Sequence, residues 1–137
     1  MKLKYILLAL ISVLSIACKK ELSVKEVDFD VVADKVTIKQ GESVKFTFEG
    51  NPNNIVFYSG ENLKDYAYSA PGGRETTGPD RPAVLKGYQN PMIPDYTYKY
   101  AAAGVYKATF VASNLNIDDI REVVRQIEIT VTAPAAP

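Results

Sequence analysis

The chain has 137 residues, 16 of them basic and 16 acidic, and it contains no histidine and a single cysteine. The absence of histidine excludes a Ser–His–Asp triad, a Cys–His pair and every histidine-based zinc or iron site. The basic residues are scattered rather than gathered into a patch, so we expect no nucleic-acid partner. The length fits one domain, and its stability must come from an apolar core because one cysteine cannot form a disulfide within the chain.

Residues 1–17 have the three parts of a secretion signal. Two lysines precede an apolar stretch that runs from Ile6 to Ala17. This stretch is too short to span a membrane, which takes roughly 20 apolar residues. The sequence Leu14-Ser15-Ile16-Ala17 before the cysteine resembles the lipobox of bacterial lipoproteins. The resemblance implies a lipoprotein signal peptide and acylation of Cys18. The alternatives are an ordinary signal peptide with an incidental cysteine, or a cysteine whose thiol is buried in the core.

Acylation of Cys18 makes the lipid bilayer the first expected partner of the mature chain. Lipoprotein cysteines carry two or three acyl chains, which anchor a protein firmly, whereas one chain holds it only marginally. Residues 18–26 then form the lipidated N-terminus and a linker. Lys19 is not the aspartate that retains some lipoproteins in the inner membrane. The outer membrane is therefore favoured, and the choice between the cell surface and the periplasmic face stays open.

From residue 27 onward, apolar and polar residues alternate with the period of two that predicts β-strands with one buried face. Residues 39–42 separate two of these stretches and predict a tight turn in which Gly41 takes a positive φ. The run from Ile55 to Tyr58 has no polar face, which predicts a strand buried on both sides. The alternating apolar positions of this half are Val27, Phe29 and Val31, then Val36 and Ile38, then Val44, Phe46 and Phe48.

Two longer alternating stretches follow in the last third of the chain. Their apolar positions are Tyr106, Ala108, Phe110 and Ala112, then Ile127, Ile129 and Val131. We expect residues 114–122 between them to form a loop or one helical turn. Residues 133–137 predict a frayed C-terminal tail, because the prolines there cannot donate to a strand ladder.

Residues 70–94 interrupt the alternation and hold more than half of the prolines and glycines of the chain. They predict a long surface loop with a brief strand at residues 83–85. Frequent turns, short strands and the lack of a long helical pattern predict an all-β fold for residues 27–132. The expected architecture is an antiparallel β-sandwich of about seven strands.

Two passages resemble known domains. In residues 98–110, Tyr100, Gly104 and Tyr106 are spaced as they are at the end of PKD domains. This resemblance implies an Ig-like sandwich with a corner where Gly104 allows the turn and the Tyr106 hydroxyl reaches the backbone. Residues 50–61 resemble the N-terminal PKD-like domain of surface lipoproteins of the Bacteroidota. Those proteins accompany glycan-uptake systems and resemble the starch-utilisation surface glycan-binding proteins.

Tyrosines are the candidate ligand-binding residues, because sugar rings present apolar faces that stack on aromatic rings. The four candidates are Tyr66, Tyr68, Tyr88 and Tyr96, which lie in or beside the long loop or on the strand that follows it. The alternative is that the tyrosines are ordinary strand and core residues. Tryptophan, the usual residue of sugar-binding platforms, is absent.

Two groups of acidic residues carry oxygen atoms close together in sequence: Asp28, Asp30 and Asp34, and then Asp118, Asp119 and Glu122. Calcium needs six to eight oxygens around one point, and neither group has a recognisable ligand spacing. We interpret both as solvated carboxylates and expect no metal and no cofactor. A glycosidase would need two carboxylates about 5–10 Å apart across a cleft, for which a sandwich of this size has little room. We therefore expect no enzymatic activity.

Two functions from different classes remain. In the first, the protein is a lipid-anchored binding module of the cell envelope, a glycan-binding accessory of a polysaccharide-uptake system. In the second, it is a structural or interaction subunit that docks on an outer-membrane transporter or another envelope protein through a sheet edge or the long loop. The resemblance to surface lipoproteins favours the first, and the small size of the domain favours the second.

Overall fold

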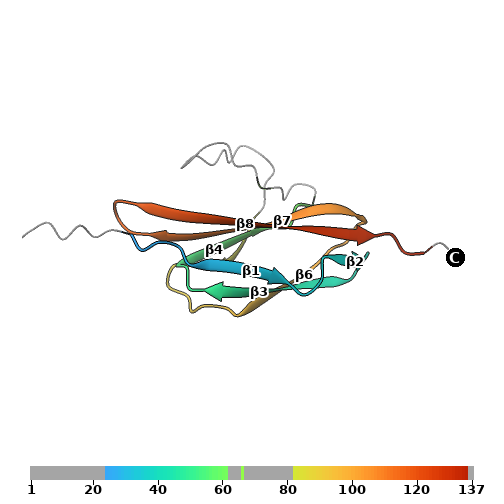
Figure 1. Cartoon of the computed structure of the whole chain (residues 1–137), viewed down its shortest axis with the longest axis horizontal. Coiled ribbons are helices and arrows are strands. Elements are labelled where there is room, and N and C mark those ends of the chain that lie inside the picture. Colours follow the sequence, from blue (N-terminus) through green and yellow to red (C-terminus); the bar gives the residue numbers. More distant parts are fainter. Residues whose placement is uncertain (1–23, 62–65, 67–81, 136–137) are drawn as a thin grey trace, which may run out of the picture.

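The computed structural model describes residues 24–61, 66 and 82–135. These residues form eight strands (Figure 1): β1 (Phe29–Ala33), β2 (Thr37–Lys39), β3 (Ser43–Gly50), β4 (Asn54–Tyr58), β5 (Ala83–Lys86), β6 (Asp95–Lys99), β7 (Gly104–Leu115) and β8 (Ile120–Thr132). No helix occurs in this part of the chain, so none there is long and apolar enough to cross a membrane. The all-β prediction is confirmed.

The strands form two sheets that face each other. One sheet has the order β1-β3-β6 and the other has the order β2-β8-β7-β4-β5. Immunoglobulin-type sandwiches place their strands A, B and E in one sheet and C, F and G in the other. In chain order, β1, β3 and β6 occupy the first set of positions, and β4, β7 and β8 occupy the second. The predicted Ig-like sandwich is therefore confirmed.

One pairing departs from the antiparallel prediction. β2 pairs with β8 in parallel, with Ile38 opposite Val131. The cause is the short bend at residues 34–36, after which the chain keeps its direction but moves from one sheet to the other. Val36 lies in this bend and is exposed rather than part of the strand. The turn at residues 39–42 forms as predicted, with Gly41 at φ 85° and the Glu42 N–H donating to the Lys39 carbonyl at 2.9 Å.

The core lies between the sheets and consists of the alternating apolar residues. At its centre the ring of Phe46 lies 5.8 Å from that of Phe57 and 5.0 Å from that of Phe110, measured between centroids. The other buried members include Phe29, Val31, Ile38, Val44, Phe48, Ile55, Ala108, Ala112, Ile129 and Val131. Their burial confirms the predicted inward faces of the strands.

β4 is buried on both faces, as its sequence predicts. Ile55 and Phe57 point into the core, whereas Val56 and Tyr58 belong to a second apolar cluster with Val111 on the outer face of the five-stranded sheet. The ring of Tyr66 packs edge-on against that of Tyr58, with 5.1 Å between centroids. This outer cluster explains why the sequence of β4 shows no alternation.

The corner between β6 and β7 has the geometry of a tyrosine corner. The hydroxyl of Tyr106 donates to the carbonyl of Ala102 at 3.0 Å, four residues upstream. Gly104 is not among the positive-φ glycines, so its part in this corner does not come from a left-handed backbone. It is needed for space instead, because a Cβ at this position would lie 3.0 Å from the Tyr106 ring and hydroxyl. Next to this corner, buried Tyr100 donates to the carbonyl of Ser59 at 3.0 Å.

The connection between β7 and β8 is much shorter than expected. The ladder continues to the pair Leu115–Ile120 and leaves only residues 116–119 as the loop, without a helical turn. The side chain of Asn116 closes this loop by accepting the N–H groups of Asp118 and Asp119, both at 2.8 Å. Such a side-chain turn lets two strands reverse without a longer loop.

Candidate functional site

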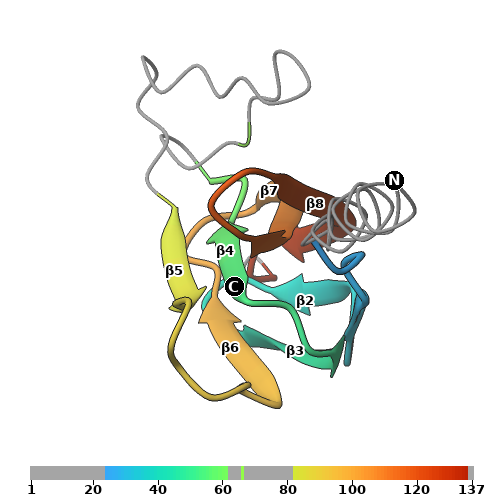
Figure 2. The same ribbon diagram turned by 90° about the vertical axis from the view of Figure 1, so that its left-hand side faces the viewer.

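Four segments of the described chain meet at one end of the sandwich, which we call the N-terminal end. They are residues 24–28, the β3–β4 connection at 51–53, the β5–β6 connection at 87–94 and the β7–β8 loop at 116–119. The described chain enters here and leaves at the opposite end, where β8 stops (Figure 1). Figure 2 views the sandwich from this side. We call the opposite end the far end.

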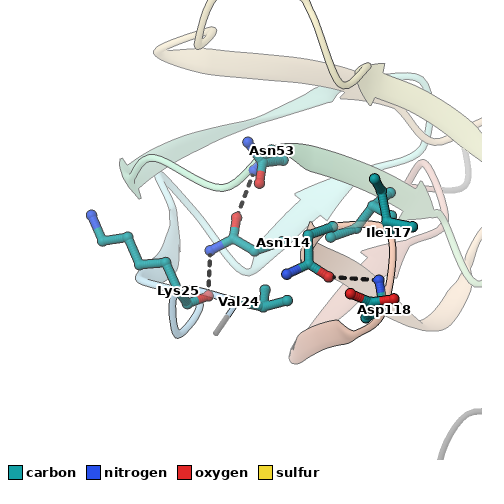
Figure 3. A pocket seen from close by; sticks show the side chains of 8 residues that line it. Val24, Lys25, Asn53, Asn114, Ile117 and Asp118 are labelled. Carbon is teal, nitrogen blue, oxygen red and sulfur yellow. Dashed lines mark hydrogen bonds between the residues drawn. The ribbon is translucent and has the colours of Figure 1, made fainter. Parts of the chain in front are cut away.

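Asn114 fixes the place where the chain enters the sandwich. This side chain is buried on β7. Its amide oxygen accepts the N–H of Asn53 at 2.9 Å, and its amide nitrogen donates to the carbonyls of Lys25 and Glu26 at 3.0 and 3.1 Å. Figure 3 shows Asn114 between the N-terminal segment and the start of β4. One amide thus joins three parts of the chain that are far apart in sequence.

A buried lysine extends this network to β5. Lys86 is 4% exposed, and its ammonium group donates to the carbonyl of Asn53 at 2.9 Å. Both backbone groups of Asn53 are therefore bound by side chains from β5 and β7. Sequence reasoning did not single out Asn114 or Lys86. The available signals were a polar residue near the end of an apolar strand and a lysine within a short one.

The β7–β8 loop presents apolar side chains to solvent. Ile117 at its tip is 101% exposed, and Leu115 and Ile120 on either side are 40% and 61% exposed. Tyr88, which is 51% exposed, donates its hydroxyl to the carbonyl of Leu115. Single exposed apolar residues are ordinary, but several gathered on one surface indicate an interaction site. We call these four residues the apolar end patch.

Two shallow hollows lie beside this patch. The first, of about 250 Å³, is lined by Val24, Lys25, Asn53 and residues 114–118 (Figure 3). The second, of about 420 Å³, is lined by Tyr88 and residues 115–117. Both include Leu115 and Ile117, so the patch and the hollows form one surface at the N-terminal end.

The charged groups at this end pair with each other. The guanidinium of Arg121 lies 3.0 Å from the carboxylate of Asp119 and 3.8 Å from that of Glu26. Asp30 pairs with Arg125 at 3.3 Å. The surface around the patch therefore carries charges of both signs, with the Arg121 guanidinium shared between two carboxylates. In the part of the chain that the structure describes, no three acidic or cysteine side chains gather where they would hold a metal ion.

The structure does not gather the tyrosines predicted to bind a glycan. Tyr66 packs on the outer face of the five-stranded sheet, and Tyr88 belongs to the apolar end patch. Tyr96 lies between the sheets, with its ring 5.2 Å from that of Phe57. Tyr68 and Cys18 lie outside the described residues. Glycan binding by these tyrosines stays a prediction.

The hydroxyl of buried Tyr100 has a clearly raised pKa. Burial is the main cause that raises the pKa of its hydroxyl far above the ordinary value of a tyrosine, and the neighbouring Tyr98 and Glu61 add to it. Tyr100 therefore stays protonated and keeps its bond to the Ser59 carbonyl. This group stabilises the fold and lies away from the N-terminal end.

Comparisons with known proteins add a family and a structural neighbour. Residues 17–81, slightly less than half of the chain, match a family described as a domain of unknown function, DUF5017. No curated protein matches. Among solved structures, the chain is similar to the solution structure of the PKD domain from the human VPS10 domain-containing receptor SorCS2. The identity is 14% over 87% of this chain and 85% of that chain, with a TM-score of 0.42. The fold assignment itself depends on the strand order described above.

Proposed function

We propose that the protein is a non-enzymatic lipoprotein that holds an Ig-like sandwich at the outer membrane as an interaction module. The observation that carries the proposal is the position of Cys18. It follows a lipobox-like sequence, and only five residues separate it from Val24, where the described chain begins. Asn114 then fixes residues 25 and 26 to the sandwich. An acylated Cys18 would therefore hold the domain by its N-terminal end, with the far end directed away from the bilayer.

The lipid anchor is tested by labelling cells with an alkyne analogue of palmitate and analysing the purified protein by mass spectrometry. We expect the label on the wild-type chain, a mass that corresponds to an acylated Cys18 at the N-terminus, and recovery in the outer-membrane fraction. The Cys18→Ser variant is the matched control and should lose the label. An unmodified thiol in the native protein would refute the proposal.

A protein of an envelope complex is the partner that the described surface favours. At the far end, Val36 and Val105 are largely exposed. They are neighbours across β8, because Thr130 lies opposite Val105 and donates its N–H to the carbonyl of Val36. β5 is the last strand of its sheet and leaves Val84 exposed. Exposed apolar side chains at an edge strand suit pairing with another protein.

Glycan capture is the second candidate, and its support is the resemblance to surface lipoproteins of the Bacteroidota. Among the predicted tyrosines, Tyr66 is the one to test first, because it lies on the outer face and not between the sheets. The two candidates are separated by purifying the lipidated protein in mild detergent. Retardation in polysaccharide gels that is lost in Tyr66→Ala supports glycan capture. Co-purification with a transporter that is lost in Val105→Asp, without retardation, supports protein docking.

A further inference from the structure

We propose that the apolar end patch, Tyr88, Leu115, Ile117 and Ile120, rests in the interface of the bilayer that holds the acyl chains of Cys18. This inference rests on the proposed lipid anchor and adds a second point of attachment. The domain would then have a fixed orientation on the membrane. The anchor alone decides which end of the domain lies near the bilayer, and the second contact would also fix the tilt of the sandwich.

The first argument is that the loop holds its apolar tip rigidly in water. Asn116 accepts two backbone N–H groups, and the N–H of Asn116 donates to the carbonyl of Asp119 at 3.0 Å. Asp119 also accepts the N–H of Ile120 and pairs with Arg121. A loop with this many internal bonds cannot fold Ile117 back against the domain, so the side chain stays fully exposed. A rigid exposed apolar tip costs little entropy when it binds a surface.

The second argument is the length of the tether and the place where it leaves the domain. The six chain steps from Cys18 to Val24 span at most about 20 Å. Strand β7 alone has 12 residues, which corresponds to roughly 37 Å. Val24 lines the same hollow as Leu115 and Ile117. The acyl chains therefore keep the N-terminal end, and not the far end, beside the lipid.

The third argument is the charge around the patch. Arg121 lies between Asp119 and Glu26 and offsets part of their negative charge, which, together with screening by salt, weakens the repulsion of an anionic lipid surface. Asp118 follows the tip directly and is exposed. A carboxylate at this position limits penetration to the headgroup region, about 5–10 Å deep, where interfacial side chains usually lie. We therefore expect shallow contact and no spanning.

The proposal is tested with a fluorescent reporter, because the chain has no tryptophan. Ile117→Trp is introduced into the lipidated protein, which is reconstituted in vesicles of phosphatidylethanolamine and phosphatidylglycerol with brominated acyl chains. The matched control is Val105→Trp, which replaces an exposed valine near the start of β7, the strand whose other end leads into the loop of Ile117. We expect the emission of the tryptophan at 117 to shift to the blue and to be quenched by the bromines, because interfacial side chains lie at the boundary of the acyl chains, and we expect the control to keep its emission. Ile120→Trp is a second reporter at the N-terminal end.

The outcomes distinguish the inference from the anchor on which it depends. If the protein floats with the vesicles and both N-terminal reporters keep a water-like, unquenched emission, the anchor stands and the membrane contact is refuted. A blue shift without bromine quenching would also refute it, because it would place the patch against a second copy or another protein. If the chain is not acylated and does not float, the proposed function itself fails.

Discussion

Removal of the Asn114 side chain should loosen the N-terminal end and destabilise the whole sandwich. In Asn114→Ala, the N–H of Asn53 loses its acceptor and the carbonyls of Lys25 and Glu26 lose their donor. A net hydrogen bond contributes about 1 kcal/mol, and a polar group left unsatisfied in a buried place costs about 1–3 kcal/mol. Because the two carbonyls belong to exposed residues that water can reach, we expect a loss of about 2–3 kcal/mol in the free energy of unfolding.

The measurement is urea unfolding followed by circular dichroism, together with hydrogen exchange of the Asn53 amide. Asn114→Asp keeps an acceptor for Asn53 but turns a buried carboxylate oxygen toward the carbonyls of Lys25 and Glu26, so it should also destabilise the sandwich and not rescue it. Asn54→Ala is the matched control, because Asn54 makes only a long 3.5 Å bond to Ser113. It should change the free energy of unfolding by less than about 1 kcal/mol. If Asn114→Ala is as stable as this control and the Asn53 amide exchanges no faster, the role given to Asn114 is wrong.

Three further predictions concern the sandwich itself. Gly104→Ala should lower the free energy of unfolding by about 1–3 kcal/mol, because the new methyl displaces the Tyr106 ring. Thermal unfolding of Gly87→Ala, where an added Cβ comes no nearer than 3.7 Å to Asn90, should show little change, and equal effects of the two substitutions would contradict the spatial role of Gly104. The pKa of Tyr100 is raised in the folded state, so its contribution to stability is constant below the ordinary tyrosine value near 10 and falls above that value by about 1.4 kcal/mol per pH unit. Urea titrations of wild type and Tyr100→Phe should diverge in this way only above that pH, and parallel curves would refute the assignment. Tyr96→Ala should lower the melting temperature because the ring packs against the core. An unchanged melting temperature would contradict this placement, and only then would a loss of polysaccharide binding in the variant be evidence that Tyr96 binds a glycan.

The strands were predictable because each of them buries one face. In β3, Val44, Phe46 and Phe48 are buried while Lys45 and Thr47 are exposed. The alternation in the sequence therefore corresponds to the buried and exposed faces of the strand. The same reasoning found β5 from three residues within a Pro- and Gly-rich region. It also found the two-sided burial of β4, because a strand with apolar residues on both faces cannot alternate.

Local sequence patterns did not predict the β7–β8 connection correctly, because a side chain closes its turn. Residues 114–122 contain Asn, Asp and Glu, which usually indicate a loop, yet most of them continue the β7–β8 ladder. The turn is closed by the side chain of Asn116, and sequence alone does not say which of several neighbouring polar residues takes that role. Likewise, Gly104 was correctly singled out, but the reason was the position of the Tyr106 ring and not its own φ.

The sequence by itself determined the class of the fold, the inward-facing residues and the exclusion of histidine chemistry, because each of these follows from residue type or from a local period. The tyrosine corner was predictable from the resemblance of residues 98–110 to the end of PKD domains. The tertiary structure alone decided that Lys25, Asn53, Lys86 and Asn114 meet, and that the exposed residues of the β7–β8 loop lie where the chain enters the sandwich. Lys25 and Asn114 are 89 residues apart, and no local pattern encodes a contact over that distance. Such contacts arise only when the two sheets close around their common core, which brings the ends of distant strands together.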